Sequence, residues 1–213
     1  MLKLSKTSKM PCKSWSLPAL ETCPGSRDKR GELVEVCQGC YATTGMYHLP
    51  KVRFSREHNR HDWKRPEWAD DMVAAIGKDP YFRWFDSGDV FHPKLAKKIR
   101  EVIMRTPNTQ HWLPTRCYKI EGIKAYLASI KKMKNACVRY SADKIGKFNK
   151  RHGSVVYDGD CDTDVPEGVT VCEAKTRGNT CGDCRNCWDK TIKVIGYPVQ
   201  GVNMRNAIDR RAA

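Results

Sequence analysis

Three cysteines stand two residues apart in the segment TCGDCRNCW, at Cys181, Cys184 and Cys187, and a fourth, Cys172, precedes them by nine positions. Consecutive C-x2-C-x2-C spacing wraps a short loop so that three thiols face inward toward one bound metal group. This arrangement suits three corners of an iron–sulfur cubane, with the fourth ligand supplied from elsewhere. A zinc site more often takes its thiolates from two separate C-x2-C pairs. The spacing therefore favours a [4Fe–4S] cluster on these four cysteines, and a zinc ribbon on the same residues is the alternative.

A second group of cysteines lies near the start of the chain. It consists of Cys12, Cys23, Cys37 and Cys40, and only Cys37 and Cys40 have strong local spacing. If all four bind, the result is a second closed cluster or a zinc site. If Cys12 does not bind, one iron stays open to a ligand. Because Cys12 lies only eleven positions before Cys23, within reach of a flexible segment, we expect the closed arrangement.

The other three cysteines have no partner at ligand spacing. We expect Cys117 and Cys137 to pack as small apolar groups; the alternative is that either one approaches the rim of the sheet, since both sit near strands. No role is predicted for Cys161. The odd total of eleven cysteines leaves at least one thiol unpaired even if all the others formed disulfides. The first residues hold no apolar run long enough for a signal peptide, so we expect a cytoplasmic protein with reduced thiols.

The region between the two cysteine groups alternates strand and helix patterns. The aromatic-rich segment YFRWFDSGDV predicts a strand that ends at a turn, and Pro93 begins the amphipathic helix PKLAKKIREVIMRTP. QHWLPT, ACVRYS, GSVVYDGD, GVTVCE and KVIGY predict further strands, and IEGIKAYLASIKKM predicts a second helix. This alternation indicates right-handed βαβ units and a mostly parallel sheet. We expect an α/β fold that closes as a partial or open (β/α) barrel.

The chain contains no internal repeat, low-complexity tract or evident linker. Its 213 residues fit one domain of ordinary size. We therefore expect a single domain over 1–213, with a cysteine segment at 1–45, a β/α core at 46–160 and a cysteine-rich segment at 161–213.

Polar residues follow the predicted strands. The turn after the first of these strands consists of Asp86, Ser87, Gly88 and Asp89. In folds of this type the chemistry collects at the carboxyl ends of the strands. We expect this turn to bind a polar ligand and to lie beside the N-terminal cysteines, with helix capping as the alternative role. The histidines of REHNRHDWKR belong to a highly charged stretch, which is typical of a solvated helix or loop.

The composition is strongly basic, with 39 Lys and Arg against 24 Asp and Glu and a formal charge of +15 spread along the chain. Such a protein is commonly attracted to polyanions, above all nucleic acid. A solubilising surface is the alternative reading. No apolar stretch is long enough to span a membrane, and the sequence leaves the oligomeric state open.

Five segments resemble, in the same order, the successive motifs of the phage-encoded "gene product eighty-eight" family of cysteine-rich proteins. They are SKTSKMPCKSWSLPALETCPGS, CQGCYATTGMY, FRWFDSGDVFHPK, LPTR and TCGDCRNCW. The resemblance spans nearly the whole chain. It implies a bacteriophage origin, a location in the host cell cytoplasm and a shared metal-bearing fold, and it does not supply an activity.

A looser similarity connects the chain with radical SAM enzymes, which build a partial (β/α) barrel around a [4Fe–4S] cluster held by three cysteines. CQGCY resembles the end of their cysteine motif, and DSGDV resembles their glycine-rich turn for S-adenosylmethionine. Their motif is C-x3-C-x2-C, whereas thirteen residues separate Cys23 from Cys37 here. The similarity therefore bears on the architecture more than on S-adenosylmethionine binding.

These features predict an iron–sulfur protein that performs redox or cluster-based chemistry on or near nucleic acid. The rival hypothesis is a zinc-stabilised module without catalysis that binds nucleic acid or a host protein, in which the cysteines serve only folding.

Overall fold

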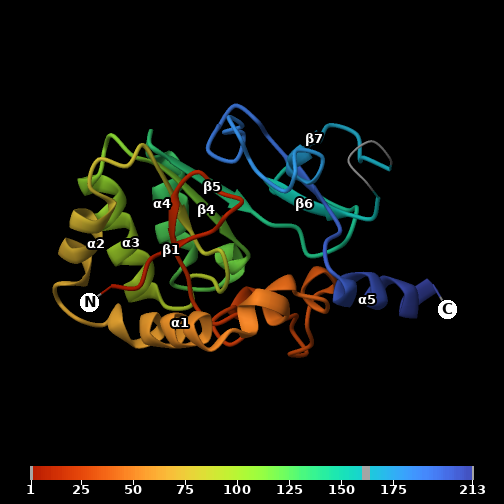
Figure 1. The fold of residues 1–213 in the computed structure, drawn as a ribbon, viewed down its shortest axis with the longest axis horizontal. Coiled ribbons are helices and arrows are strands. Elements are labelled where there is room, and N and C mark those ends of the chain that lie inside the picture. Colours follow the sequence, from red (N-terminus) through yellow and green to blue (C-terminus); the bar gives the residue numbers. More distant parts are fainter. Residues whose placement is uncertain (1, 160–163, 213) are drawn as a thin grey trace.

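The computed structural model of the protein describes residues 2–159 and 164–212 (Figure 1). Its central feature is a five-stranded sheet. The strands are β1 (Ser5–Lys6), β2 (Lys13–Trp15), β3 (Tyr81–Trp84), β4 (Gln110–Thr115) and β5 (Ala136–Tyr140). They lie in the order β1-β2-β3-β4-β5, with β1 antiparallel to β2 and all other neighbours parallel.

Helices connect the successive parallel strands. They are α1 (Pro50–Asp62) and α2 (Trp68–Ile76) between β2 and β3, α3 (Pro93–Arg105) between β3 and β4, and α4 (Lys124–Lys132) between β4 and β5. The start of α3 shows why the sequence forms a helix there. Pro93 needs no backbone hydrogen bond in the first turn, and the ring of His92 accepts one from the Lys94 N–H at 3.1 Å.

Short 3-10 helices lie in the loops of the described part of the chain. They are η1 (Pro24–Ser26), η2 (Glu35–Cys37), η3 (Tyr41–Thr43), η4 (Gly45–His48), η5 (Cys117–Lys119) and η6 (Glu173–Lys175). η2 ends at a cysteine, η5 begins at one, and η1, η3 and η6 each begin directly after one. A 3-10 turn reverses the chain within a few residues, so these loops can hold thiols close to one another.

Side chains alternate between the two faces of the sheet, as a pleated strand requires. Phe82 and Trp84 of β3 are fully buried in the main core with apolar residues of α2, α3 and α4. Arg83 lies on the other face, where its guanidinium is 4.6 Å from the centre of the Trp112 ring. The C-terminal segment covers this second face, and Trp188 Nε1 donates to Phe82 O at 3.0 Å (Figure 1).

Arg139 of β5 fixes the covering segment. This side chain, from a residue only 2% exposed, donates to the carbonyl oxygens of Asn186 (2.7 Å), Cys187 (3.0 Å) and Asp189 (2.7 Å). A buried guanidinium needs such acceptors, and an irregular segment needs donors for its carbonyls. The two requirements are met together, so the cysteine-rich segment is held on the sheet without regular structure of its own.

A second sheet continues from the first. It contains β6 (Ser154–Tyr157), β7 (Thr170–Val171) and β8 (Ile195–Pro198) in the parallel order β6-β8-β7. An isolated parallel bridge between Ser141 and Ser154 joins it to the end of β5. The predicted α/β class and mostly parallel sheet are confirmed. Within residues 2–159 and 164–212 the strands form no closed barrel.

The last helix, α5 (Val202–Ala212), packs against the loop that carries Cys37 and Cys40. Met204 and Ala207 of α5 are 5% and 6% exposed. A Cβ atom on Gly39 would lie 2.4 Å from Met204 Cα, closer than real Cβ contacts come. Only glycine therefore allows this contact. Figure 1 shows the same neighbourhood, with blue α5 beside the orange N-terminal part of the chain.

Most predicted strands lie where the sequence places them, and none of the described helices is both long and apolar enough to cross a membrane. β2, α2 and α5 were not predicted. The missed β2 matters most, because it separates residues that the sequence alone had grouped together.

Candidate functional site

The four C-terminal cysteines lie together on the second face of the sheet. Cys172 directly follows β7, and its N–H donates to Gly196 O at 2.9 Å. The Cys184 N–H donates to Cys181 O at 2.9 Å, which closes the first C-x2-C turn. Burial raises the pKa of Cys181, and the neighbouring thiols of Cys172 and Cys184 raise it further. The structure thus brings the predicted set into one neighbourhood.

Cys187 is a half-buried thiol of this set that lies in a largely apolar environment. Burial raises its pKa to about 12, and the thiol of Cys172 adds to the rise. Its Sγ atom lies 3.4 Å from Tyr197 Oη, within range of a hydrogen bond to sulfur. The guanidinium groups of Arg139 and Arg83 act in the opposite sense and favour the thiolate. The position therefore combines an apolar environment with two nearby cations.

An apolar and sulfur-rich cluster forms the floor under these cysteines. Its buried members are Met10, Cys12, Trp112 and Trp188, and Tyr81, Cys181, Cys187 and Tyr197 pack against them. Cys181 Sγ lies 3.7 Å from Met10 Sδ, and the rings of Trp112 and Trp188 meet edge to face at 5.5 Å. Such a floor excludes water from one side of the thiols, which strengthens electrostatic interactions there.

The structure places Cys12 with this C-terminal group, whereas the sequence predicted that it completes the N-terminal group. It is 7% exposed, and burial raises its pKa to about 12, with a smaller contribution from the thiol of Cys181. The physical reason is β2, which begins at the next residue and carries the chain along the sheet before Cys23. Three of the ten residues that connect Cys12 to Cys23 form this extended strand, so the connection is less flexible than the sequence suggested.

Two buried donors beside the C-terminal group have no acceptor in the described part of the chain. They are Trp112 Nε1, on a side chain in the same cluster, and Arg83 Nε. Arg83 Nη1 does bind Asp86 Oδ1 at 2.8 Å. An unpaired buried N–H costs about 1–3 kcal/mol, so both atoms would be stabilised by a bound group with acceptors.

The N-terminal cysteines form a separate group at the carboxyl ends of the strands. Cys23 precedes η1, Cys37 ends η2 and Cys40 precedes η3. The Cys40 N–H donates to Cys37 O at 3.3 Å, which closes the C-x2-C turn. Burial raises the pKa of Cys23, followed by the carboxylate of Asp89 and the thiols of Cys37 and Cys40. The three thiols are therefore neighbours, and the expected proximity to the turn at 86–89 is confirmed.

The turn at 86–89 is bound to the segment that leads into Cys23. The Leu17 N–H donates to Ser87 O at 3.0 Å, and the Asp89 N–H donates to Thr22 O at 3.1 Å. Gly88 has φ of +75°, and a Cβ atom there would lie 2.5 Å from Leu17 Cβ. Glycine is therefore required both for the left-handed backbone and for the close approach.

The side chains of this turn are occupied by the fold. Asp86 Oδ2 accepts from Tyr47 Oη at 2.9 Å, and the Ser87 hydroxyl donates to Leu17 O at 2.7 Å. Asp89 accepts from the Val90 N–H at 2.7 Å and from the Arg116 N–H at 2.8 Å. Burial raises the pKa of Asp89, and these donors oppose the rise. The turn, which was expected to hold a ligand, ties strands and loops together.

The structure adds Cys117 to the N-terminal group, although the sequence assigned it to packing. It is fully buried at the start of η5, directly after β4. Burial raises its pKa, and Asp89 and the thiol of Cys23 add to the rise. The signal was present in the sequence, because TRC follows the strand next to the one that ends in DSGD. Parallel neighbours place such ends on one rim.

The two remaining cysteines are Cys137, which belongs to neither group, and Cys161. Cys137 is buried on β5, where burial raises its pKa and the charged groups around it are Arg139, Lys190, Asp189 and Lys131. Cys161 lies outside the described residues. Within those residues, no three side chains of His, Cys, Asp or Glu converge closely enough to hold a metal ion.

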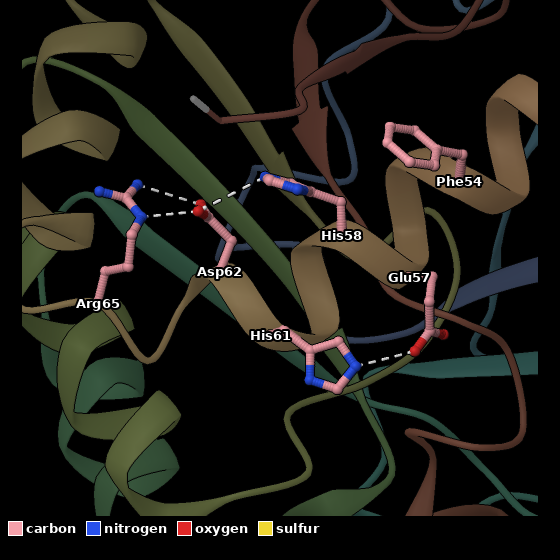
Figure 2. Close-up of a pocket in the computed structure, with 6 residues that line it drawn as sticks. All are labelled: Phe54, Glu57, His58, His61, Asp62 and Arg65. Carbon is pink, nitrogen blue, oxygen red and sulfur yellow. Dashed lines mark hydrogen bonds and ion pairs between the residues drawn. The ribbon is translucent and has the colours of Figure 1, made fainter.

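A shallow groove along α1 collects the histidines of the charged stretch. It is lined by Phe54, Glu57, His58, His61, Asp62 and Arg65 (Figure 2). Asp62 binds Arg65 Nε at 2.7 Å and lies 3.5 Å from His58 Nε2, and His61 Nε2 lies 3.0 Å from Glu57. These are pairs along one helix face, as predicted for a charged helix, and no cysteine lines the groove.

Comparisons with known proteins give one positive result. The model of a family described as Gene product 88 matches residues 2–190, a range that includes both cysteine groups and ends before α5. No curated protein and no solved structure matches the chain.

Proposed function

This chain belongs to the Gene product 88 family, and from that premise we propose that it is a phage-encoded iron–sulfur protein whose C-terminal cysteines hold a [4Fe–4S] cluster. The proposed ligands are Cys172, Cys181, Cys184 and Cys187. Its role is redox or cluster-based chemistry associated with nucleic acid. An open, radical-SAM-like partial barrel is the proposed scaffold, with β6, β8 and β7 continuing the curve of the main sheet.

The observation that carries the proposal is the pair of unsatisfied donors beside these cysteines. Trp112 is 5% exposed, and its Nε1 has no acceptor within the described residues. Arg83 Nε is also buried and has no acceptor within the described residues. Sulfides and thiolates of an iron–sulfur cluster accept hydrogen bonds, and such bonds tune its potential. A cluster at this place would therefore satisfy donors that the protein itself leaves unpaired.

Charge supports the same assignment. A [4Fe–4S] cluster with four thiolates carries a net negative charge, and a buried charge needs a partner. Arg83 and Arg139 lie close enough to Cys187 to favour its ionised form. The bound cluster would supply one-electron chemistry, while Trp112, Trp188 and Tyr197 keep water from one side of it.

The basic chain supports the association with nucleic acid. A formal charge of +15 attracts a polyanion whether or not the cluster reacts. In the rival hypothesis the same cysteines bind zinc and only stabilise the fold. Metal identity separates the two, because iron with acid-labile sulfide excludes the zinc form.

The first experiment is anaerobic purification followed by iron, sulfide and zinc analysis of the wild type and of Cys184→Ser. Loss of a [4Fe–4S] cluster removes about four iron atoms per chain, so that difference is expected for Cys184→Ser. Cys137→Ser is the matched control, since Cys137 is a buried thiol with no cysteine among the groups that shift its pKa. Equal iron content in the wild type and Cys184→Ser contradicts the proposal.

Binding of S-adenosylmethionine at the turn 86–89 is a separate part of the proposal. Ser87 and Asp89 are 5% and 6% exposed and bonded within the fold, so its binding requires the turn to open. Addition of S-adenosylmethionine to the anaerobic protein tests this part by the absorption and electron paramagnetic resonance spectra. An unchanged spectrum removes this cofactor and leaves the cluster assignment untouched.

A further inference from the structure

We infer that Cys23, Cys37, Cys40 and Cys117 form a second, four-thiolate metal centre at the carboxyl ends of the parallel strands. The inference extends the proposed function to another site of the same chain, and it does not require the C-terminal cluster. Its ligands come from the loop after β2, from the C-x2-C turn and from the residue that begins η5 after β4.

The loop after β2 and the end of β4 are built to meet. A Cβ atom on Gly25 would lie 2.5 Å from both the carbonyl carbon and the oxygen of Arg116. No other residue fits there, so the backbone between Cys23 and Ser26 lies directly on the residue before Cys117. This contact brings two cysteines together that are far apart in the sequence.

Asp89 binds both of these segments at once. Its carboxylate accepts from the Arg116 N–H at 2.8 Å, and its own N–H donates to Thr22 O at 3.1 Å. The residues bound in this way directly precede Cys117 and Cys23. The carboxylate therefore fixes the relative position of the two thiols, and it also accepts a hydrogen bond from the Cys117 thiol.

The C-x2-C turn is anchored on both sides. The Val36 N–H donates to Asp143 O at 3.2 Å, just beyond the end of β5. On the other side Tyr41 Oη donates to Asp86 O at 2.7 Å, at the end of β3. Although the ring of Tyr41 is 46% exposed, its hydroxyl reaches into the protein. Cys37 and Cys40 are thus held over the same rim as the other two cysteines.

A cation and backbone donors lie around these thiols, whose pKa values are raised by burial. The guanidinium of Arg116, which donates to Ala142 O at 3.2 Å, lies beside Cys37 and Cys40. The backbone N–H groups of Gly25 and Ala42 donate to the sulfurs of Cys117 and Cys40. Metal-bound thiolates are commonly held in this way, by a nearby cation and by backbone donors.

Metal analysis of four single variants tests the inference. In Cys117→Ser and Cys40→Ser one complete centre should be lost, which is about four iron and four sulfide for a [4Fe–4S] cluster or one zinc for a tetrahedral ion. Cys137→Ser, the matched buried thiol, should keep all its metal. Cys12→Ser should keep the metal of the N-terminal centre. The same analysis identifies the metal: iron together with sulfide indicates a [4Fe–4S] cluster, and zinc without sulfide indicates a tetrahedral zinc ion.

A folded Cys117→Ser protein with the full metal content overturns the inference. Because Cys117 is fully buried, Cys117→Ala serves as a second variant that keeps the position apolar, and circular dichroism verifies its fold. If neither variant folds, the metal content of Cys12→Ser tests whether the N-terminal centre forms without Cys12. Loss of the N-terminal metal in Cys12→Ser, and not only a change at the C-terminal centre, overturns the assignment, whereas retention supports it.

The two proposals fail separately. Metal loss in Cys117→Ser with none in Cys184→Ser leaves this second centre and removes the C-terminal cluster. The opposite pattern removes only the second centre. The double variant Cys117→Ser/Cys184→Ser should hold neither metal, and any metal left in it contradicts the division into two sites.

Discussion

The buried charges of this protein are concentrated around Asp86. This carboxylate accepts from Tyr47 Oη at 2.9 Å and from Arg83 Nη1 at 2.8 Å, and it lies 3.5 Å from Arg56 Nη2. The side chains of Asp86 and Arg56 are 7% and 9% exposed. Burial lowers the pKa of Arg56, and the carboxylate opposes that shift. One anion thus compensates two buried cations, Arg83 of β3 and Arg56 of α1.

Replacement of Asp86 by Ala should therefore be severe. It leaves Arg83 and Arg56 buried without a carboxylate, and breaking a buried pair typically costs about 3–5 kcal/mol. Chemical denaturation of the metal-loaded protein measures the loss. Asp70→Ala is the control, since Asp70 pairs with Arg105 at 2.7 Å on the surface. A midpoint for Asp86→Ala as close to wild type as that of Asp70→Ala would contradict this role.

His111 is a second buried titratable residue, on the core side of the sheet. Trp84 Nε1 donates to its Nδ1 at 3.3 Å, and its Nε2 lies 2.9 Å from Thr106 Oγ1. Burial lowers the pKa of His111 to about 3, from its ordinary value near 6.5. The folded state therefore holds this imidazole neutral.

This shift predicts a pH dependence of stability. Between about pH 6.5 and 3 the unfolded chain binds a proton that the folded chain excludes, so stability is complete above pH 6.5 and falls with decreasing pH. The slope reaches about 1.4 kcal/mol per pH unit in the middle of this window. Urea denaturation of wild type and His111→Gln from pH 7 to pH 4 should show a smaller slope in the variant; equal slopes exclude His111 as the cause.

At the level of secondary structure, turns decide where the chemistry lies. The left-handed backbone at Gly88 lets the chain end β3 and pack against Leu17 and Thr22 within a few residues. The same turn presents Asp89 to the end of β4. A side chain at position 88 would displace the segment that carries Cys23.

Gly88→Ala should destabilise the protein by about 2 kcal/mol or more, since strain and collision add. Gly146→Ala is a matched control, because Gly146 has φ of +67° and nothing within 4 Å of a built Cβ. It should show only the cost of strain, about 1 kcal/mol. Thermal unfolding compares the two variants. Equal losses would mean that the contact with Leu17 contributes nothing.

The elements also show what the sequence can and cannot predict. β3, β4 and β5 were predictable because their residues alternate between two buried faces and end at polar turns. β2 has only three residues and no visible periodicity, and it is a strand only because it pairs with β1 and β3. The misplacement of Cys12 follows directly from that gap. Cys117 was missed because no local spacing marks a ligand that only the sheet brings near.

At the level of the whole molecule, charge and cysteines are distributed differently. The formal charge of +15 is spread over the chain, while most of the described cysteines collect into two groups. Four metal-bound thiolates in each group would cancel part of this excess. The remaining charge is on the surface, because most Lys and Arg side chains are exposed or half-buried.

We expect the intact protein to bind DNA or RNA with an affinity that falls steeply with salt. Contact with about three phosphates lowers affinity more than tenfold between about 50 and 200 mM salt, through the release of counterions. Fluorescence anisotropy titrations over this range measure the slope, with an uncharged polymer of similar size as the control. No binding at the lowest salt would favour a protein partner instead.

The contact between Gly39 and α5 has a consequence for how the protein matures. All eleven cysteines precede residue 188, whereas α5 begins at Val202, beyond the matched range 2–190. Because synthesis runs from the N-terminus, the C-x2-C turn at Cys37 leaves the ribosome long before α5 does. The turn therefore stays uncovered until α5 has emerged, and the metal of the proposed second centre would enter during that interval. In that proposal α5 would then cover a loop that already holds its metal.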